Sequence, residues 1–195
     1  MVRHNTARTI ATLLLWIALV SAPVLADIQT GSTRPEEPSV EQRLAGYTER
    51  LQMAYSLASV ASYSLTPIDL RSHTQQLINL LEGSKGRHAT EMRPPFSEYI
   101  GLLEETARLM VYFDTRPISP EIRRTVHSSL ERVRSYLEAT LEAALDAQVQ
   151  RRLGPATDRM LRAYAFLATA LTGNPETPGW IGILYLPDLL ERGGV

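Results

Sequence analysis

Apolar residues recur every three or four positions along most of the chain, and no segment alternates strictly between apolar and polar residues. The first spacing is typical of amphipathic helices, whereas a half-buried strand requires the second. We therefore expect an all-α fold in which helices pack through their apolar stripes. The chain contains no cysteine, so disulfides and Cys-ligated metals are excluded and the core alone must stabilise the fold.

Capping residues, prolines and glycines divide the chain into five expected helices. A capping box at Ser39 starts the first, Thr66 before a proline starts the second, and Ser119 before a proline starts the longest. Gly83 and Gly173 end the second and the fifth. The predicted five-helix bundle has helices at 40–63, 67–82, 96–113, 120–153 and 156–172, then a short apolar tail at 180–187 and a turn at 188–192.

Residues 1–26 have the layout of a cleavable secretory signal peptide. Basic side chains precede an apolar run over 10–20, which is shorter than the ~20 residues that a membrane-spanning helix needs. Ala26 is small and stands before polar Asp27, so we expect cleavage between them; an uncleaved N-terminal anchor is the alternative. The mature protein is then expected to be periplasmic or secreted, with no membrane span.

The mature chain is expected to open with a disordered lead-in over 27–38, which is polar and rich in Gly, Pro and Glu. Residues 39–195 are expected to form a single α-helical domain. The chain has 20 Lys+Arg and 21 Asp+Glu, and removal of the signal peptide takes away two arginines. A mildly acidic protein of this kind is not expected to bind nucleic acid. All basic residues except Lys85 are arginine, which indicates a GC-rich bacterial genome.

The sequence contains none of the common catalytic or nucleotide-binding signatures, such as Gly-x-Ser-x-Gly, His-Glu-x-x-His or the phosphate-binding glycine loops. It also lacks the Glu-x-x-His pairs of di-iron helical bundles. We therefore assign no catalytic residue, no metal site and no cofactor, and we expect a binding protein rather than an enzyme.

Three polar residues of the second expected helix are candidate ligand-binding residues. His73 falls within an apolar arc, and Asp69 lies one turn before it. A carboxylate in that position fixes the imidazole tautomer, which a metal ligand, a general base and a buried structural histidine all require, so these interpretations stay open. Asn79 is costly inside a helix, and it is either held by a hydrogen-bond partner or exposed to solvent.

The connection over 83–95 is the longest internal stretch without a helical period, and loops of that length are often functional. Its His88 and Glu91 have the spacing His-x-x-Glu, which suits a ligand but is also common on solvated surface. The C-terminal tail either folds over the bundle or presents a patch to a protein or cell-envelope partner. Its candidate partner-binding residues are Trp180, Ile183 and Tyr185.

An internal duplication is faintly visible. Leu-Glu-Gly at 81–83 is followed by Tyr-Ile-Gly at 99–101, and Leu-Thr-Gly at 171–173 is followed by Trp-Ile-Gly at 180–182. This order favours two pseudo-repeated helical hairpins. The alternative is that any two Leu/Ala-rich amphipathic helices look alike.

The stretch from His73 to Gly83 resembles a helix-end pattern of exported, uncharacterised bacterial helical proteins, in which His, Asn and Gly recur before a loop. The resemblance implies an exported helical fold and no assigned activity. Three hypotheses remain: an exported binding or interaction protein that uses the long loop or the tail, a small-ligand, haem or metal-binding bundle centred on His73, and a periplasmic all-α lyase or mutase with convergent Arg and Glu side chains. We favour the first.

Overall fold

The computed structural model describes residues 38–90, 99–174 and 181–192, and nearly all of them are helical. The expected signal peptide and lead-in, together with Glu91 and Trp180, lie outside the described residues. The helices are α2 (Val40–Ser62), α3 (Pro67–Glu82), α4 (Leu102–Asp114), α5 (Pro120–Val149), α6 (Leu153–Thr172), the 3-10 helix η1 (Ile183–Tyr185) and α7 (Leu186–Arg192).

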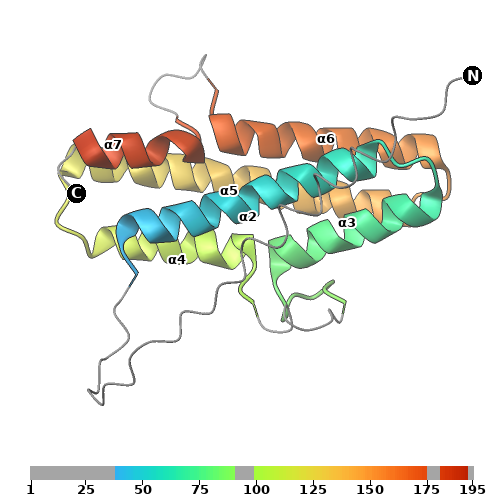
Figure 1. Cartoon of the computed structure of the whole chain (residues 1–195), viewed down its shortest axis with the longest axis horizontal. Helices are drawn as coiled ribbons and strands as arrows, with labels where there is room; N and C mark the ends of the chain where they lie inside the picture. The colour runs from blue at the N-terminus through green and yellow to red at the C-terminus, as the bar shows by residue number, and fades with distance from the viewer. Residues whose placement is uncertain (1–37, 91–98, 175–180, 193–195) are drawn as a thin grey trace, which may run out of the picture. The chain divides into compact units, whose positions relative to one another are not determined.

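The long helices α2 and α5 lie alongside two interrupted helical segments. In one segment α3 and α4 follow each other roughly end to end, and in the other α6 is followed by α7 (Figure 1). The all-α prediction is thus confirmed. Within the described ranges, no helix combines the length and the apolar character that a membrane span requires.

The first two helices begin where their capping residues predict. Ser39 Oγ accepts the backbone N–H of Gln42 at 3.2 Å, and the Gln42 side chain accepts the N–H of Ser39 at 3.0 Å, which completes the capping box. Thr66 caps α3, and Pro67 occupies its first position. Both are local signals, so they are independent of the rest of the fold.

The third helix begins later than expected, at Leu102 instead of residue 96. Gly101 before it is extended, with φ −68° and ψ 155°, and Ile100 forms an isolated β-bridge with Gly83. At residues 99–101, backbone pairing with the end of α3 therefore takes the place of the expected helix.

The boundary between the fourth and fifth helices also differs from the prediction. Helix α5 ends at Val149 instead of residue 153, because Gln150 and Arg152 are both extended. Helix α6 starts at Leu153, and Pro155 lies in its first turn. A proline is tolerated there because the N–H that it lacks has no partner within the helix.

The core follows the predicted stripes. Small side chains of α2 and α6 are fully buried, which lets these helices approach closely, and Tyr55 and Tyr164 stack between them with ring centroids 4.5 Å apart. Buried Tyr47 of α2 bonds through its hydroxyl to Thr106 of α4 at 2.6 Å. The buried alanines of the two helices are Ala54, Ala58, Ala61, Ala156, Ala163 and Ala170.

A pair of glycines closes each interrupted segment. Gly83 ends α3 with φ +80° and donates its N–H to Asn79 O at 2.7 Å. A Cβ on Gly83 would lie 2.8 Å from the carbonyl oxygen of Tyr99, and one on Gly101 would lie closer than 3.0 Å to the backbone of Glu82. No side chain fits between these two backbones, so glycine is required on both sides.

The second pair, Gly173 and Gly182, repeats this geometry. Gly173 ends α6 with φ +78° and donates to Thr169 O at 2.9 Å. A Cβ on it would lie 2.5 Å from Gly182 N, and one on Gly182 would lie within 3.0 Å of the backbone at Thr172 and Gly173. We call the two pairs the first and the second glycine junction.

The C-terminal tail packs on the bundle. Ile183, Leu186 and Leu190 are buried, whereas Tyr185 is about half exposed at 51%. The described part of the tail, residues 181–187, therefore folds over the helices, while Leu184 and Tyr185 stay partly exposed. Ile183 therefore has no surface to offer a partner.

Candidate functional site

A polar cleft of about 210 Å³ lies between the end of α3, the connection that follows it and α4. The residues that line it carry charges of both signs together with hydroxyl groups. They are Glu82, Ser84, Lys85, Tyr99, Ile100, Glu104 and Arg108. The cleft adjoins the first glycine junction, because Ser84 and Ile100 are each one residue from a junction glycine.

Asn79 fixes the connection that forms one wall of this cleft. Its side chain is 3% exposed, so the alternative of solvent exposure is wrong. Asn79 Oδ1 accepts Gln75 Nε2 at 2.9 Å and the backbone N–H of Thr90 at 3.0 Å, and its Nδ2 donates to Thr90 Oγ1 at 3.3 Å. Gln75 also donates to the carbonyl of His88 at 2.9 Å. Asn79 therefore holds the loop in place against α3.

Glu82 holds the same connection from the end of α3. Its Oε2 accepts the backbone N–H of His88 at 2.7 Å, and its Oε1 lies 2.7 Å from His88 Nδ1, which donates when that nitrogen carries the proton. The Glu82 side chain is only 10% exposed, against 39% for His88. Glu82 is not among the candidate residues predicted from the sequence. A carboxylate at a helix C-terminus opposes the helix dipole, and that position was the available sign that it needs a specific partner.

Arg50 of α2 supports the side of the cleft nearest α4. Its Nη1 donates to the carbonyl of Ile100 at 2.8 Å, and its guanidinium forms an ion pair with Glu105. Burial raises the pKa of Tyr99 to about 12, and the positive charge of Arg50 partly opposes that rise. Tyr99 therefore presents a neutral phenol at neutral pH. Burial also lowers the pKa of Arg50, because desolvation disfavours its charged form.

The charged groups at the mouth of the cleft are accessible. Arg108 and Glu104 form an i,i+4 ion pair on α4 with Nη2 and Oε1 2.6 Å apart, and both side chains are more than half exposed. Lys85 is exposed and forms no ion pair with the residues that the structure describes. A cation and a breakable ion pair thus face any molecule that enters.

Asp69 and His73 do not form the expected pair. Asp69 is exposed, and its Oδ2 accepts the hydroxyl of Thr66 at 2.7 Å as part of the α3 cap. His73 is half-buried, with Nδ1 3.4 Å from Ser64 Oγ. Both residues lie in the first half of α3, whereas the cleft is at its other end. Among the described residues, no three His, Asp or Glu side chains gather as a metal site would require.

The structure thus brings two of the candidate residues together, Asn79 and His88, and assigns both to holding the loop. No protein-family model, no curated protein and no solved structure matches this chain.

Proposed function

We propose that the protein is an exported helical binding protein that engages a polar segment of a partner protein at the cleft beside the first glycine junction. One observation carries the proposal: the cleft has charged walls of both signs, and its loop is fixed before any ligand arrives by Asn79 and Glu82. Fixing a loop in advance lowers the entropy that binding must otherwise supply.

The size of the cleft indicates what it can hold. Sites for whole drug-sized ligands measure about 300–1,000 Å³, and this cleft measures about 210 Å³. It suits one or two polar side chains of a polypeptide, with Lys85 and Arg108 facing acidic groups and Glu104 facing a basic one. A protein or cell-envelope partner is therefore favoured over haem or another large cofactor.

The two rival hypotheses have no comparable support. His73 lies 3.4 Å from Ser64 Oγ, and it lines neither the cleft nor the small pocket between α3 and the α5–α6 link. The arginines and glutamates of α2 and α4 at the cleft pair with each other, Arg108 with Glu104 and Arg50 with Glu105. Their charges are therefore already matched, which is unlike the arrangement that a lyase or mutase would use on its substrate.

The proposed export rests on the sequence of residues 1–26. Sequencing the N-terminus of the mature protein from a cell that exports it tests this part, and we expect a start at Asp27. An intact Met1, or a start far from residue 27, would contradict it.

We also propose that the chain is a tandem pseudo-repeat, in which α2, α3 and α4 correspond to α5, α6 and η1–α7. The two glycine junctions support this, because they share the positive φ, the N–H bond four residues back and the tight approach of a second glycine. In that correspondence the binding cleft belongs to the first copy, since Asn79 and Glu82 stand where the second copy has Thr169 and Thr172.

Charge reversal at the mouth of the cleft tests the binding role. We expect Lys85→Glu combined with Arg108→Glu to abolish capture of the partner from an envelope extract, as measured by quantitative mass spectrometry of co-purified proteins. Arg134→Glu is the matched control, because Arg134 also pairs with a glutamate at i,i+4, at 3.0 Å, and lies on α5. Equal loss in both variants, or no loss in either, would refute the cleft as the binding site.

A further inference from the structure

The turn between α2 and α3 exposes three large apolar side chains. Tyr63 is 77% exposed, Leu65 is 89% exposed and Ile68 is 78% exposed. They lie within six residues of one another, and Thr66, which caps α3, stands between Leu65 and Ile68. At the same end of the bundle, the last residue of α5, Val149, is 74% exposed. The exposure of these apolar side chains needs an explanation, because residues of the same types are buried in the core elsewhere in the chain.

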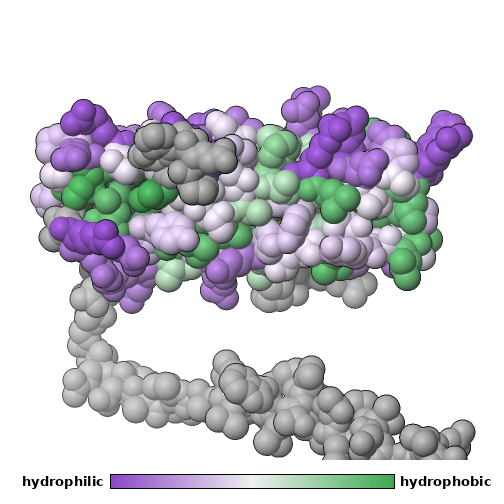
Figure 2. Space-filling view, turned by 90° about the horizontal axis from the view of Figure 1, so that it is seen from above, coloured by the Kyte–Doolittle hydropathy of each residue, from purple (hydrophilic) through white to green (hydrophobic). Residues whose placement is uncertain are grey.

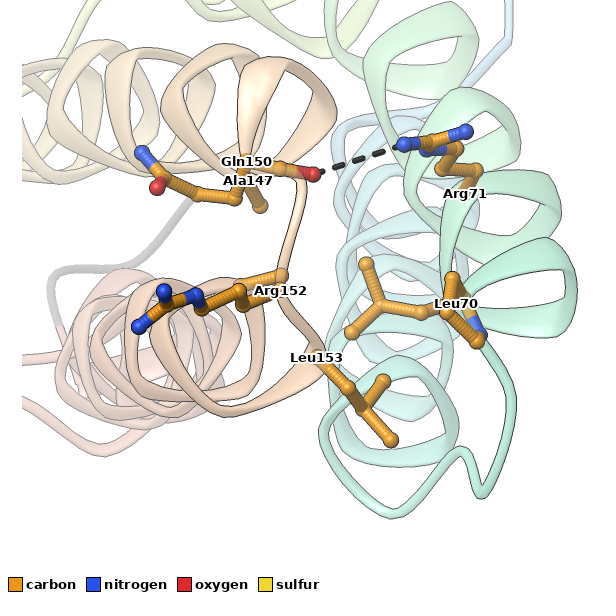
Figure 3. Close-up of a pocket in the computed structure, with 8 residues that line it drawn as sticks. Leu70, Arg71, Ala147, Gln150, Arg152 and Leu153 are labelled. Carbon is orange, nitrogen blue, oxygen red and sulfur yellow. Dashed lines mark hydrogen bonds between the residues drawn. The ribbon is translucent and has the colours of Figure 1, made fainter.

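Arginines surround this turn. Arg71 of α3 and Arg151 and Arg152 of the α5–α6 link are all exposed. The two turns are tied together, because Arg71 Nη2 donates to the carbonyl of Gln150 at 3.4 Å and Gln148 Nε2 donates to the carbonyl of Arg71 at 3.0 Å. Figure 3 shows Arg71 reaching across to Gln150, with Arg152 in the adjoining link. Figure 2 shows apolar surface beside strongly hydrophilic surface at this end of the bundle, on its right.

The acidic side chains near these turns offset the arginines only in part. Asp69 accepts a hydrogen bond from Thr66 in the α3 cap. Asp146 lies 3.6 Å from Arg159, so this pair is internally matched. Asp158, on the second turn of α6, is exposed. Three arginines therefore face two unpaired carboxylates, and the end as a whole is cationic.

From these contacts we infer that this end of the bundle docks on the surface of an anionic phospholipid membrane. We call it the apolar tip, defined by Tyr63, Leu65, Ile68, Arg71, Arg151 and Arg152. Aliphatic side chains enter the boundary of the acyl chains, a tyrosine ring stays at headgroup level, and arginines meet lipid phosphates. The tip presents all three kinds of group.

A second copy of the chain fits the tip less well. A stable protein interface buries about 800 Å² on each partner, whereas one turn with three apolar side chains offers on the order of a few hundred Å². The tip also leaves the proposed binding cleft free, because the 16 residues of α3 separate the two by about 24 Å.

Flotation of the mature chain with vesicles tests the inference. The probes are vesicles of phosphatidylcholine alone and vesicles with about one third phosphatidylglycerol. We expect binding to the anionic vesicles that weakens with salt, a loss of more than about tenfold in Leu65→Ser/Ile68→Ser, and a loss of about fivefold for each arginine replaced in Arg151→Gln/Arg152→Gln. The controls are Val111→Ser, at a residue 64% exposed on α4, and Arg134→Gln on α5, and both should bind like the wild type.

Each other outcome overturns the inference. These outcomes are no binding to anionic vesicles, equal binding to neutral ones, and equal losses in the controls. Sedimentation that shows a Leu65-dependent dimer without vesicle binding would assign the tip to self-association instead. Thermal unfolding of every variant checks that the fold is intact, which we expect because all the substituted side chains are exposed.

Discussion

The first and second glycine junctions have the same backbone and different side chains. In both, a glycine with positive φ ends a helix, and a second glycine passes against it. At the first junction Asn79 and Glu82 reach out to the connection and bond to Thr90 and His88.

At the second junction, within the described residues, the corresponding side chains bond to their own helix and to the glycine that ends it. Thr169 Oγ1 donates to Ala165 O at 2.8 Å, and Thr172 Oγ1 donates to Ala168 O at 2.9 Å. Closing a helical segment and shaping a loop are therefore separate tasks. Glycines perform the first task in both halves, and in the first half Asn79 and Glu82 perform the second.

The largest expected effect is the loss of either junction. We expect Gly101→Ala and Gly182→Ala each to lower the free energy of unfolding by about 3 kcal/mol or more, because the added Cβ meets backbone that cannot move aside. Urea unfolding followed by circular dichroism measures this. Gly46→Ala is the control: its Cβ meets nothing within 4 Å in α2, so it should stabilise by about 1 kcal/mol. Equal stability of Gly46→Ala and Gly101→Ala would show that the first junction does not require glycine at position 101.

The next effect separates the two halves. We expect Asn79→Ala to lower the free energy of unfolding by about 2 kcal/mol, since it removes a buried side chain whose oxygen accepts from both Gln75 and the N–H of Thr90. Thr169→Ala removes one bond within its own helix and should change stability by less than about 0.5 kcal/mol. Hydrogen exchange of the Thr90 amide gives a local measure of the same change. Similar losses in the two variants would show that the second junction also depends on side chains.

A smaller effect on stability is expected at alkaline pH, and it arises from Tyr99 beside the first junction. The pKa of Tyr99 is about 12 in the folded chain, whereas an unfolded tyrosine titrates near ~10. The unfolded state therefore loses its proton first as the pH rises, and stabilisation present below pH ~10 is lost between about 10 and 12.

Tyr99→Phe should reduce the loss of stability across that range, and urea unfolding at a series of pH values measures the slope. Tyr136→Phe on α5 is a tyrosine control outside this junction. An unchanged slope in Tyr99→Phe would mean that the phenol is not desolvated by the first junction.

The smallest effect is at the mouth of the cleft. Glu104→Gln and Glu138→Gln each break an exposed i,i+4 ion pair and should change the free energy of unfolding by less than about 0.5 kcal/mol. Their melting temperatures should agree, whereas only Glu104→Gln should alter partner capture. A marked destabilisation by Glu104→Gln would instead give this pair a structural role.

Much of the fold was predictable from local signals. The capping residues Ser39 and Thr66 and the terminal glycines Gly83 and Gly173 marked helix ends correctly, because each acts through its own turn. The start of α4 was not predictable from periodicity, because apolar spacing continues through residues 96–101 while Ile100 pairs with Gly83 across the junction.

The candidate site was predictable only in part. The cost of an asparagine inside a helix singled out Asn79, but it left open whether a hydrogen-bond partner or solvent satisfies the side chain, and the structure supplies the partner. The contacts of Asn79 with Thr90 and of Glu82 with His88 depend on the path of the connection. No local sequence pattern specifies that path. The expected pairing of Asp69 with His73 failed because the helix cap competed for the same carboxylate.

At both glycine junctions, the position of the helices does not depend on the length of the connection between them. The chain leaves the bundle and re-enters it at almost the same point, with Gly83 beside Gly101 and Gly173 beside Gly182. The first connection is twice as long as the second, yet lengthening a closed loop in this way costs little entropy. Insertions and exchanged segments can therefore accumulate at these two points over evolution, or by design, while the helices keep their register.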